Sequence, residues 1–280
     1  MVKVLSRINK LRKKLFRLRS YISTRGKSPE ALTNTQQSFI IWNAERLGIS
    51  PQESRERYFA SWSAVNGGHA GADYRLYSDV SYKLFQVFFS DKGDEVYTSY
   101  ERHGFLHFLR MLSYSEHRWS EDDLMVRHFE KYSHVDIVDY GCGLAHRSRS
   151  LADYLKSKGI MTRLFLADIP TVRKDFLLWL GLQSDIETTF LDCTVSSPIP
   201  QLPGCDICIA TDFFEHVNNP LNYFEKIHSA LRKNGLLVTS VSDHKKEFMH
   251  LSPNLQPLRN RIHELKYDVL VENDIFRKTL

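Results

Sequence analysis

Two glycines separated by one residue lie where a buried strand is expected to meet a helix. The segment reads V-D-Y-G-C-G-L-A over residues 138–145, with the glycines at Gly141 and Gly143. Glycine lets the backbone pass close to a ligand, and a helix N-terminus offers free N–H groups to it. A dinucleotide-binding fingerprint needs a third glycine where His146 stands, and the sequence contains no Walker A loop. The spacing therefore disfavours a dinucleotide site.

Further polar residues follow the next three expected strands. Asp168 ends the second strand, 25 residues after the second glycine, where a carboxylate can accept hydrogen bonds from both hydroxyls of a ribose. Asp192 and Cys193 end the third strand, where a side chain could bond an adenine amino group and a backbone N–H a ring nitrogen. Thr211 and Asp212 follow the fourth strand. These positions strengthen the case for a ligand site at the glycine loop.

The order and spacing of these four motifs resemble the class I S-adenosylmethionine-dependent methyltransferases, over about residues 135–278. The most specific parts are the E-H-V-x-x-P segment at 215–220 and the N-G-L-L-V turn at 234–238. The resemblance implies S-adenosylmethionine as cofactor. The sequence departs from the family at Ala145, where a third glycine is usual, and the extra methyl group bears on how the methionine carboxylate fits.

The resemblance also implies a role for each matching residue. Asp139, Gly141 and Gly143 would hold the methionine end of the cofactor, and Asp168 with Ile169 would hold the ribose. Asp192 and Cys193 would flank the adenine, and Thr211 and Asp212 would line the methyl-donor side. The alternative for each acid is a cap at a strand end, which competes most closely at Asp192.

Methyl transfer requires an aligned acceptor, exclusion of water and, for many acceptors, removal of a proton. Histidine suits the last task, because its pKa lies near neutrality. His216 is the first candidate for the catalytic base, with His244 and His250 as alternatives after the fifth strand.

A divalent metal is the other means of deprotonation. Asp212, Glu215 and His216 form an acid-x-x-Glu-His pattern that could bind a cation together with one of the later histidines. The cation would lower the pKa of a vicinal diol or catechol hydroxyl. The pattern resembles the quinone-biosynthesis O-methyltransferases and the small-RNA terminal ribose methyltransferases, in which the first acid is commonly Glu. Related proteins without a metal also carry Glu-His here as loop support, so both roles stay open.

The elements that position these residues follow from hydrophobic periodicity. After residue 133, strands and helices alternate, which predicts an α/β fold with a Rossmann-like, doubly wound, mostly parallel seven-stranded sheet. Strands are expected at 135–140, 163–167, 187–191, 206–210, 236–241, 267–271 and 274–278. Helices are expected between them at 145–158, 171–182, 220–232 and 254–265, and the proline-containing segment 196–204 predicts a loop.

Residues before 134 show helical patterns without alternating strands. Helices are expected at 36–47, from 51 to about 65, and at 80–90, 97–112 and 121–132. We therefore divide the chain into a leader at 1–29, a helical N-terminal region at 30–133 and a methyltransferase domain at 134–280. We expect the helical region to cap the cofactor cleft and to form much of the acceptor site.

The leader carries ten Lys or Arg and no acid, whereas the remaining 251 residues hold 28 basic and 33 acidic residues. Its apolar residues recur at helical spacing, which predicts a basic amphipathic helix. Contact with an anionic membrane, nucleic acid binding, a coiled-coil or docking helix, organellar targeting and packing on its own domain are the alternatives.

Composition narrows the remaining possibilities. The sequence has no apolar run of 18 residues, and four cysteines are too few for a disulfide scaffold. Cys205 and Cys208 are expected as small core residues. We expect a cytoplasmic enzyme, with peripheral membrane contact as a possibility, that methylates an oxygen of a small molecule, glycan or lipid-linked intermediate. An RNA methyltransferase and an inactive scaffold are the alternatives, and the acidic body argues against a broad nucleic-acid surface.

Overall fold

The computed structural model describes residues 32–66, 111–112, 119–194, 197–243 and 250–279. The leader, the expected helix at 80–90, most of the one at 97–112 and the candidate base His244 lie outside these residues. In the part of the chain that the structure describes, no helix has the length and apolarity needed to cross a membrane.

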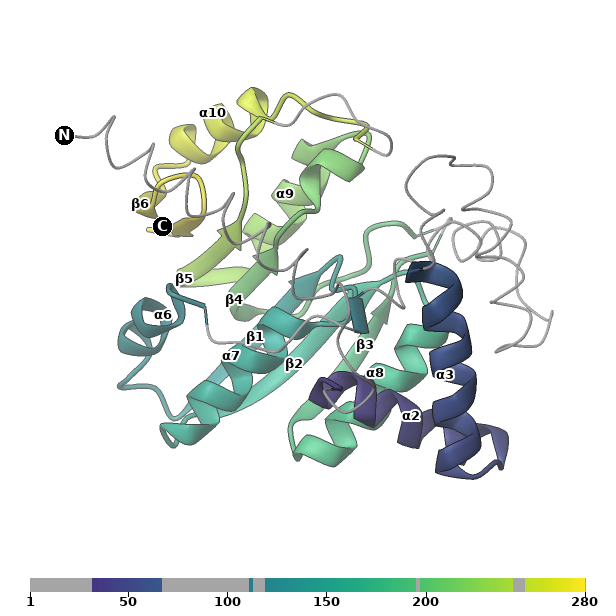
Figure 1. Cartoon of the computed structure of the whole chain (residues 1–280). Coiled ribbons are helices and arrows are strands. Elements are labelled where there is room, and N and C mark those ends of the chain that lie inside the picture. Colours follow the sequence, from purple (N-terminus) through teal and green to yellow (C-terminus); the bar gives the residue numbers. More distant parts are fainter. Residues whose placement is uncertain (1–31, 67–110, 113–118, 195–196, 244–249, 280) are drawn as a thin grey trace.

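A seven-stranded sheet forms the centre of the described structure, in the order β3-β2-β1-β4-β5-β7-β6 (Figure 1). The strands are β1 (His134–Tyr140), β2 (Met161–Asp168), β3 (Glu187–Asp192), β4 (Cys205–Ala210), β5 (Leu231–Thr239), β6 (Asp268–Val271) and β7 (Ile275–Arg277). The first five pair in parallel, and β7 runs antiparallel to both β5 and β6. The predicted doubly wound, mostly parallel sheet is confirmed.

Helices cover both faces of this sheet, as hydrophobic strands of a parallel sheet require. They are α6 (Asp122–His128), α7 (His146–Ser157), α8 (Val172–Ser184), α9 (Pro220–Ala230) and α10 (Gln256–Glu264). One buried cluster joins α6, α7 and α8 to the sheet, and a second joins α9 and α10 to its other face. The core therefore consists of two layers with the sheet between them.

The largest differences from the predicted boundaries lie at the start of β5 and the end of α6. The expected helix 220–232 ends at Ala230, because Leu231 adopts an extended backbone and pairs with Cys205 at the start of β5. The strand expected from 236 therefore begins five residues earlier. Helix α6 is shorter than the expected 121–132, since Phe129 leaves helical geometry. The loop expected at 196–204 is confirmed over its described residues 197–204, which contain no helix.

Two further helices lie outside α8: α2 (Asn34–Leu47) packs against α8, and α3 (Pro51–Asn66) packs against α2 (Figure 1). Thr33 caps α2 through a reciprocal pair of hydrogen bonds with Gln36, and Gly48 ends it in a left-handed conformation. The rings of Phe39 and Trp42 lie 5.6 and 5.3 Å from the ring of Phe176 on α8. These contacts attach the described part of the N-terminal region to the sheet domain.

At the amino ends of the strands, an ionic network joins β1, β2, β4 and β5. Asp136 is buried and accepts hydrogen bonds from Arg163 at 2.8 and 2.9 Å and from Arg232 at 2.7 Å. Arg232 also donates to Asp206 at 2.7 Å. Burial opposes ionisation of Asp136, but these donors together with His134 outweigh it and hold its pKa well below the usual range.

The strand order also indicates where a ligand-binding crevice is expected. The chain runs outward from β1 to β2 and β3 and then returns to β4 on the other side of β1. Ligands of open α/β sheets bind at the carboxyl ends of the strands where the order reverses in this way. Here that point lies between the ends of β1 and β4.

Candidate active site

The glycine loop after β1 takes an unusual backbone conformation. Gly141, Gly143 and Ala145 all have positive φ angles, of 69°, 55° and 53°. The first two positions suit glycine, but a left-handed alanine costs about 1 kcal/mol. Ala145 is the N-cap of α7 and its side chain is buried. The departure from the family's third glycine therefore preserves a glycine-like backbone at this position.

Asp168 at the end of β2 is joined to this loop. Its Oδ2 accepts a hydrogen bond from the Gly143 N–H at 2.8 Å, and its Oδ1 accepts one from the Ile169 N–H at 2.7 Å. Arg173 lies 3.6 Å from the same Oδ1. The Cys142 thiol is a further, longer donor to Oδ2, at 3.9 Å. A carboxylate has about four acceptor positions, and the two backbone N–H groups occupy two of them, so positions remain at which a ribose hydroxyl could compete.

Asp139 lies beneath the loop and is 5% exposed. The Ser148 hydroxyl on α7 donates to its Oδ2 at 2.5 Å. Burial raises the pKa of Asp139 to about 7, the Ser148 hydrogen bond acts in the opposite direction, and the nearby charge of Asp168 adds to the rise. Asp139 therefore connects β1 to the start of α7 and supports the loop from below.

The end of β3 has partners within the protein. Both oxygens of the Asp192 carboxylate accept from the Lys174 ammonium, at 2.8 and 2.9 Å. The Cys193 N–H donates to the carbonyl of Asp168 at 2.9 Å. In this arrangement neither group faces adenine without a competing partner, and the adenine role of these two residues stays a prediction.

The turn after β4 holds the remaining implied cofactor residues. Asp212 is exposed and has a φ of 50°, in the left-handed region. The following Phe213 packs edge-on against Tyr140 and Tyr223, with ring centroids 4.8 and 5.3 Å away. Its ring also covers Gly141, because a β-carbon placed there would lie 2.5 Å from Phe213 Cδ2. Sequence reasoning missed Phe213, although it lies between two residues that it had selected.

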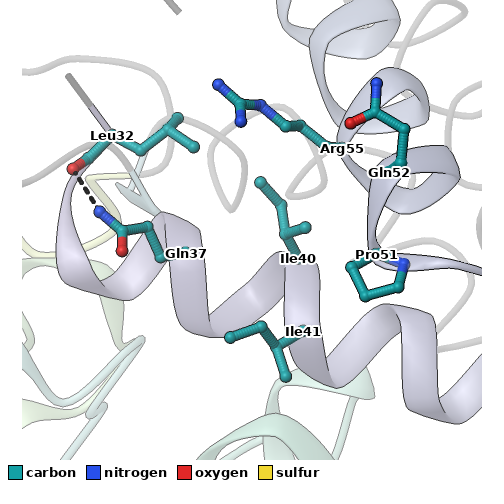
Figure 2. Close-up of a pocket in the computed structure, with 7 residues that line it drawn as sticks. All are labelled: Leu32, Gln37, Ile40, Ile41, Pro51, Gln52 and Arg55. Atoms are coloured by element: carbon teal, nitrogen blue, oxygen red, sulfur yellow. Dashed lines mark hydrogen bonds between the residues drawn. The ribbon is translucent and has the colours of Figure 1, made fainter. Parts of the chain in front are cut away.

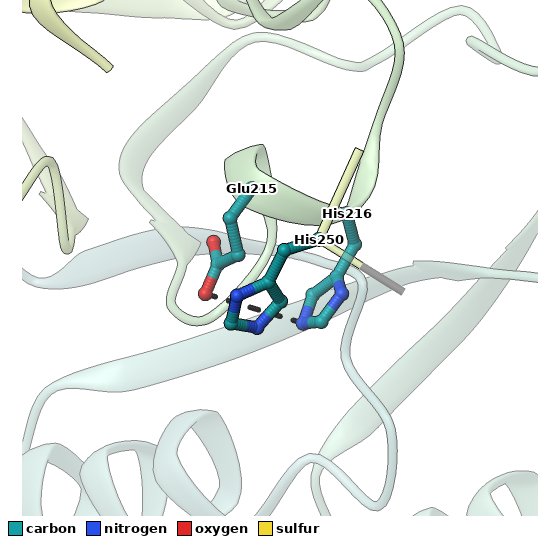
Figure 3. A group of neighbouring side chains, drawn as sticks. All are labelled: Glu215, His216 and His250. Atoms are coloured by element: carbon teal, nitrogen blue, oxygen red, sulfur yellow. Dashed lines mark ion pairs between the residues drawn. The ribbon is translucent and has the colours of Figure 1, made fainter. Parts of the chain in front are cut away.

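Glu215, His216 and His250 come together beyond this turn (Figure 3). One ligand atom from each lies within 4.8 Å of the others, and His216 Nε2 is 4.0 Å from Glu215 Oε1. Glu215 is buried, whereas both histidines are half-buried. Asp212, the first acid of the predicted metal motif, is not a member of this group. The structure thus brings His250 to His216 across 34 residues of chain.

The cysteines near the site are reduced and buried. Cys142, Cys193, Cys205 and Cys208 are free thiols, and Cys205 and Cys208 have no exposed surface. Burial raises the pKa of Cys193 and of Cys205 to about 12. This agrees with the expectation that the C-x-x-C pair serves as small core residues.

A separate groove lies between α2 and α3 (Figure 2). It has a volume of about 320 Å³ and is lined by Leu32, Gln37, Ile40, Ile41, Pro51, Gln52 and Arg55. None of the implied cofactor residues lines it, so it is distinct from the crevice at the carboxyl ends of the strands.

The seven-stranded, mostly parallel sheet with helices on both faces is a Rossmann-like, doubly wound α/β fold. The residues at this edge of the sheet would fit S-adenosylmethionine, since the acid Asp168 ends β2 and is joined to the glycine loop that follows β1. No model of a known protein family and no curated protein matches the chain.

Solved structures similar to this one include a protein from Listeria monocytogenes assigned to class I S-adenosylmethionine-dependent methyltransferases. It is 14% identical, with 88% of this chain and 86% of that chain covered and a TM-score of 0.45. A protein from Galdieria sulphuraria assigned as a sarcosine dimethylglycine methyltransferase is 16% identical, with coverage of 42% and 43% and a TM-score of 0.34. The cyclase SpnF is 17% identical, with coverage of 42% and 44% and a TM-score of 0.31.

The chain spans less than half the length of the last two proteins. At these identities and TM-scores, the similarities carry no argument about activity, substrate or assembly. The strand order defines the fold, and function must be argued from the site.

Proposed function

We propose that the protein transfers a methyl group from S-adenosylmethionine to an oxygen of a small molecule, glycan or lipid-linked intermediate. The observation that carries this proposal is the hydrogen bond between Asp168 and Gly143, which joins the carboxyl ends of β2 and β1. This bond places a carboxylate that can accept hydrogen bonds from ribose hydroxyls next to the glycine loop. An acid that served only as a cap at a strand end would not need to contact that loop.

The cofactor, when bound, supplies a methyl group on a positively charged sulfur. Asp168 would hold the ribose hydroxyls, and the loop containing Gly141 and Gly143 would lie against the methionine part. Thr211 and Asp212 would border the methyl-donor side. The protein's contribution to an in-line displacement is alignment and exclusion of water, for which the aromatic side chain of Phe213 beside Gly141 is suited.

A calorimetric titration with S-adenosylmethionine tests the proposal. Asp168→Ala should abolish detectable binding, because it removes the ribose acceptor and the partner of the Gly143 N–H. Glu187→Ala, an exposed acid at the opposite end of β3, is the control and should bind like the wild type. Absence of binding in the wild type, or equal binding by Asp168→Ala, would refute the proposal and favour the inactive scaffold.

The cluster of Glu215, His216 and His250 gives two ways to deprotonate an acceptor. One carboxylate and two imidazoles suit a divalent cation such as Zn²⁺ or Mn²⁺, and bonds of about 2.1 Å place the ligand atoms roughly 3.5 Å apart. The observed spread of 4.8 Å requires only a modest contraction. Without a cation, His216 is the candidate base, and its Nε2 lies 4.0 Å from Glu215 Oε1.

Metal titration separates these roles. If the cluster binds a cation, Mn²⁺ should bind the wild type, His250→Ala should lose that binding, and His263→Ala on α10 should retain it. Chelation should then stop methyl transfer, and added Mn²⁺ should restore it. If His216 acts as base alone, methyl transfer should survive chelation and His216→Ala should abolish it without altering cofactor affinity.

For the leader, we propose contact with an anionic membrane. Its basic residues and apolar stripe support this role. Full-length protein should float with vesicles that contain phosphatidylserine, and a chain lacking residues 1–29 should not. Equal flotation of the two would refute membrane contact. A salt-sensitive RNA shift that depends on the leader would favour the RNA alternative.

A further inference from the structure

Gly141 and Gly143 of the glycine loop are each covered by a side chain from a distant part of the sequence. Phe213 covers Gly141 from the end of β4. Met111 covers Gly143, because a β-carbon placed on that glycine would lie 3.4 Å from Met111 Sδ and 3.7 Å from Met111 Cε. Met111 comes from the N-terminal region, in which the sequence pattern identified no cofactor residue.

Two hydrogen bonds fix the backbone around Met111. His146 Nε2 lies 2.9 Å from the Met111 carbonyl oxygen, so the ring donates to it. The Thr33 hydroxyl donates to the neighbouring Leu112 carbonyl, also at 2.9 Å. The Leu112 side chain is fully buried. The Met111 and Leu112 carbonyls are therefore both held by side chains, one on α7 and one at the start of α2. These two bonds fix the position of Met111 against the glycine loop.

These contacts link two parts of the molecule that the sequence treats separately. His146 is the first residue of α7 and directly follows the glycine loop. Thr33 is the N-cap of α2. A continuous set of contacts thus runs from Asp168 through Gly143 to Met111, and through Leu112 to the start of α2.

We propose that Met111 is a cofactor-contact residue supplied by the N-terminal region, that His146 is its positioning residue, and that cofactor binding and the attachment of α2 stabilise one another. The inference rests on the proposed function, since it takes S-adenosylmethionine as the ligand of the loop. A methionine thioether is polarizable and adapts to an irregular ligand surface. Linkage between two sites is reciprocal, so the effect must be measurable from both ends.

Calorimetry with the demethylated product, S-adenosylhomocysteine, tests the contact. Met111→Ala should weaken binding about tenfold, equivalent to about 1.4 kcal/mol. Met161→Ala removes an exposed methionine at the start of β2, far from the loop, and should leave binding unchanged. Binding by Met111→Ala within twofold of the wild type would overturn the contact. Thermal unfolding establishes that both variants are folded.

Amide hydrogen exchange tests the linkage. S-adenosylhomocysteine should slow exchange in α2 of the wild type. His146→Phe, which cannot donate to Met111, should lose this effect and weaken binding about as much as Met111→Ala. His146→Gln retains a side-chain N–H donor and should restore both. Equal slowing of α2 in His146→Phe and the wild type would overturn the role of His146.

The outcomes for the two proposals differ. If the wild type does not bind S-adenosylhomocysteine, the proposed function fails and this inference fails with it. If the wild type binds it and Met111→Ala and His146→Phe bind it equally well, the proposed function stands and only the role of Met111 and His146 is refuted.

Discussion

The Ser148 hydroxyl donates a 2.5 Å hydrogen bond to the carboxylate of Asp139, and both side chains are buried. The bond connects the carboxyl end of β1 to the first turn of α7 beneath the glycine loop. Because burial opposes ionisation, the pKa of Asp139 is raised to about 7 from an unfolded value of 3.8. This difference makes stability depend on pH.

Asp139→Asn should therefore change the pH dependence of unfolding. Between about pH 4 and pH 7 the folded wild type keeps a proton that the unfolded chain releases, so this group's contribution to stability falls as pH rises. The slope is at most about 1.4 kcal/mol per pH unit. The free energy of unfolding, measured with urea, should therefore rise for Asp139→Asn relative to the wild type between pH 5 and pH 8. A constant difference would contradict the raised pKa.

The ionic network at the other end of the sheet should behave in the opposite way. Asp136 accepts hydrogen bonds from two arginines, so Asp136→Asn should lower the free energy of unfolding at pH 7 by about 3 kcal/mol. The deficit should shrink on acidification below about pH 4, because the pKa of Asp136 is depressed and the wild type loses this stabilisation as that pKa is approached. Glu53→Gln removes an exposed pair with Arg57 and should change stability by less than about 1 kcal/mol.

The hydroxyl of Tyr140 anchors the loop between β3 and β4. It donates to the Pro198 carbonyl at 2.9 Å from a side chain that is almost fully buried. Tyr140→Phe should lower the free energy of unfolding by about 1 kcal/mol, since it leaves that carbonyl without this donor. Tyr132→Phe changes an exposed tyrosine and should be neutral in the same urea titration. Equal stability of the two variants would show that the loop does not depend on this bond.

Much of the sheet domain could be predicted from the sequence because its signals are local. Glycines, strand-end acids and apolar runs mark β1, β2, β3 and β4, and the predicted order of elements from residue 134 is confirmed. The predicted end of the helix at residue 232 was wrong, because helical propensity continues past Ala230. The helix ends there because Leu231 pairs with Cys205, which is distant in the sequence. Local patterns do not report such pairing.

The site was predictable only where motif position implies function. Asp168 and Gly143 were selected on spacing, and the structure joins them by a hydrogen bond. Met111 could not be found, because a single methionine among apolar residues carries no signal of what it faces. The partner of Asp192 was equally hidden, since Lys174 reaches it from the preceding helix, α8, across 18 residues of chain. Such contacts depend on packing between elements and not on any one segment.

The contact between Gly141 and Phe213 permits a quantitative test. Gly141→Ala should lower the free energy of unfolding for two reasons, a positive φ and a steric clash with the Phe213 ring. Gly159 also has a positive φ, of 79°, but no atom lies within 4 Å of a β-carbon placed there. Gly159→Ala should therefore cost only the backbone term, about 1 kcal/mol, and Gly141→Ala should cost more.

The clash can be isolated by a double-mutant cycle with Phe213→Ala. If the ring causes the excess cost at Gly141, the double variant should be more stable than the sum of the single effects implies, with an interaction energy of about 1–2 kcal/mol. Additive effects would show that the ring yields freely and is not held against the loop. Because Phe213 is fixed by Tyr140 and Tyr223, we expect it to resist displacement, which would keep a rigid aromatic wall beside the cofactor loop.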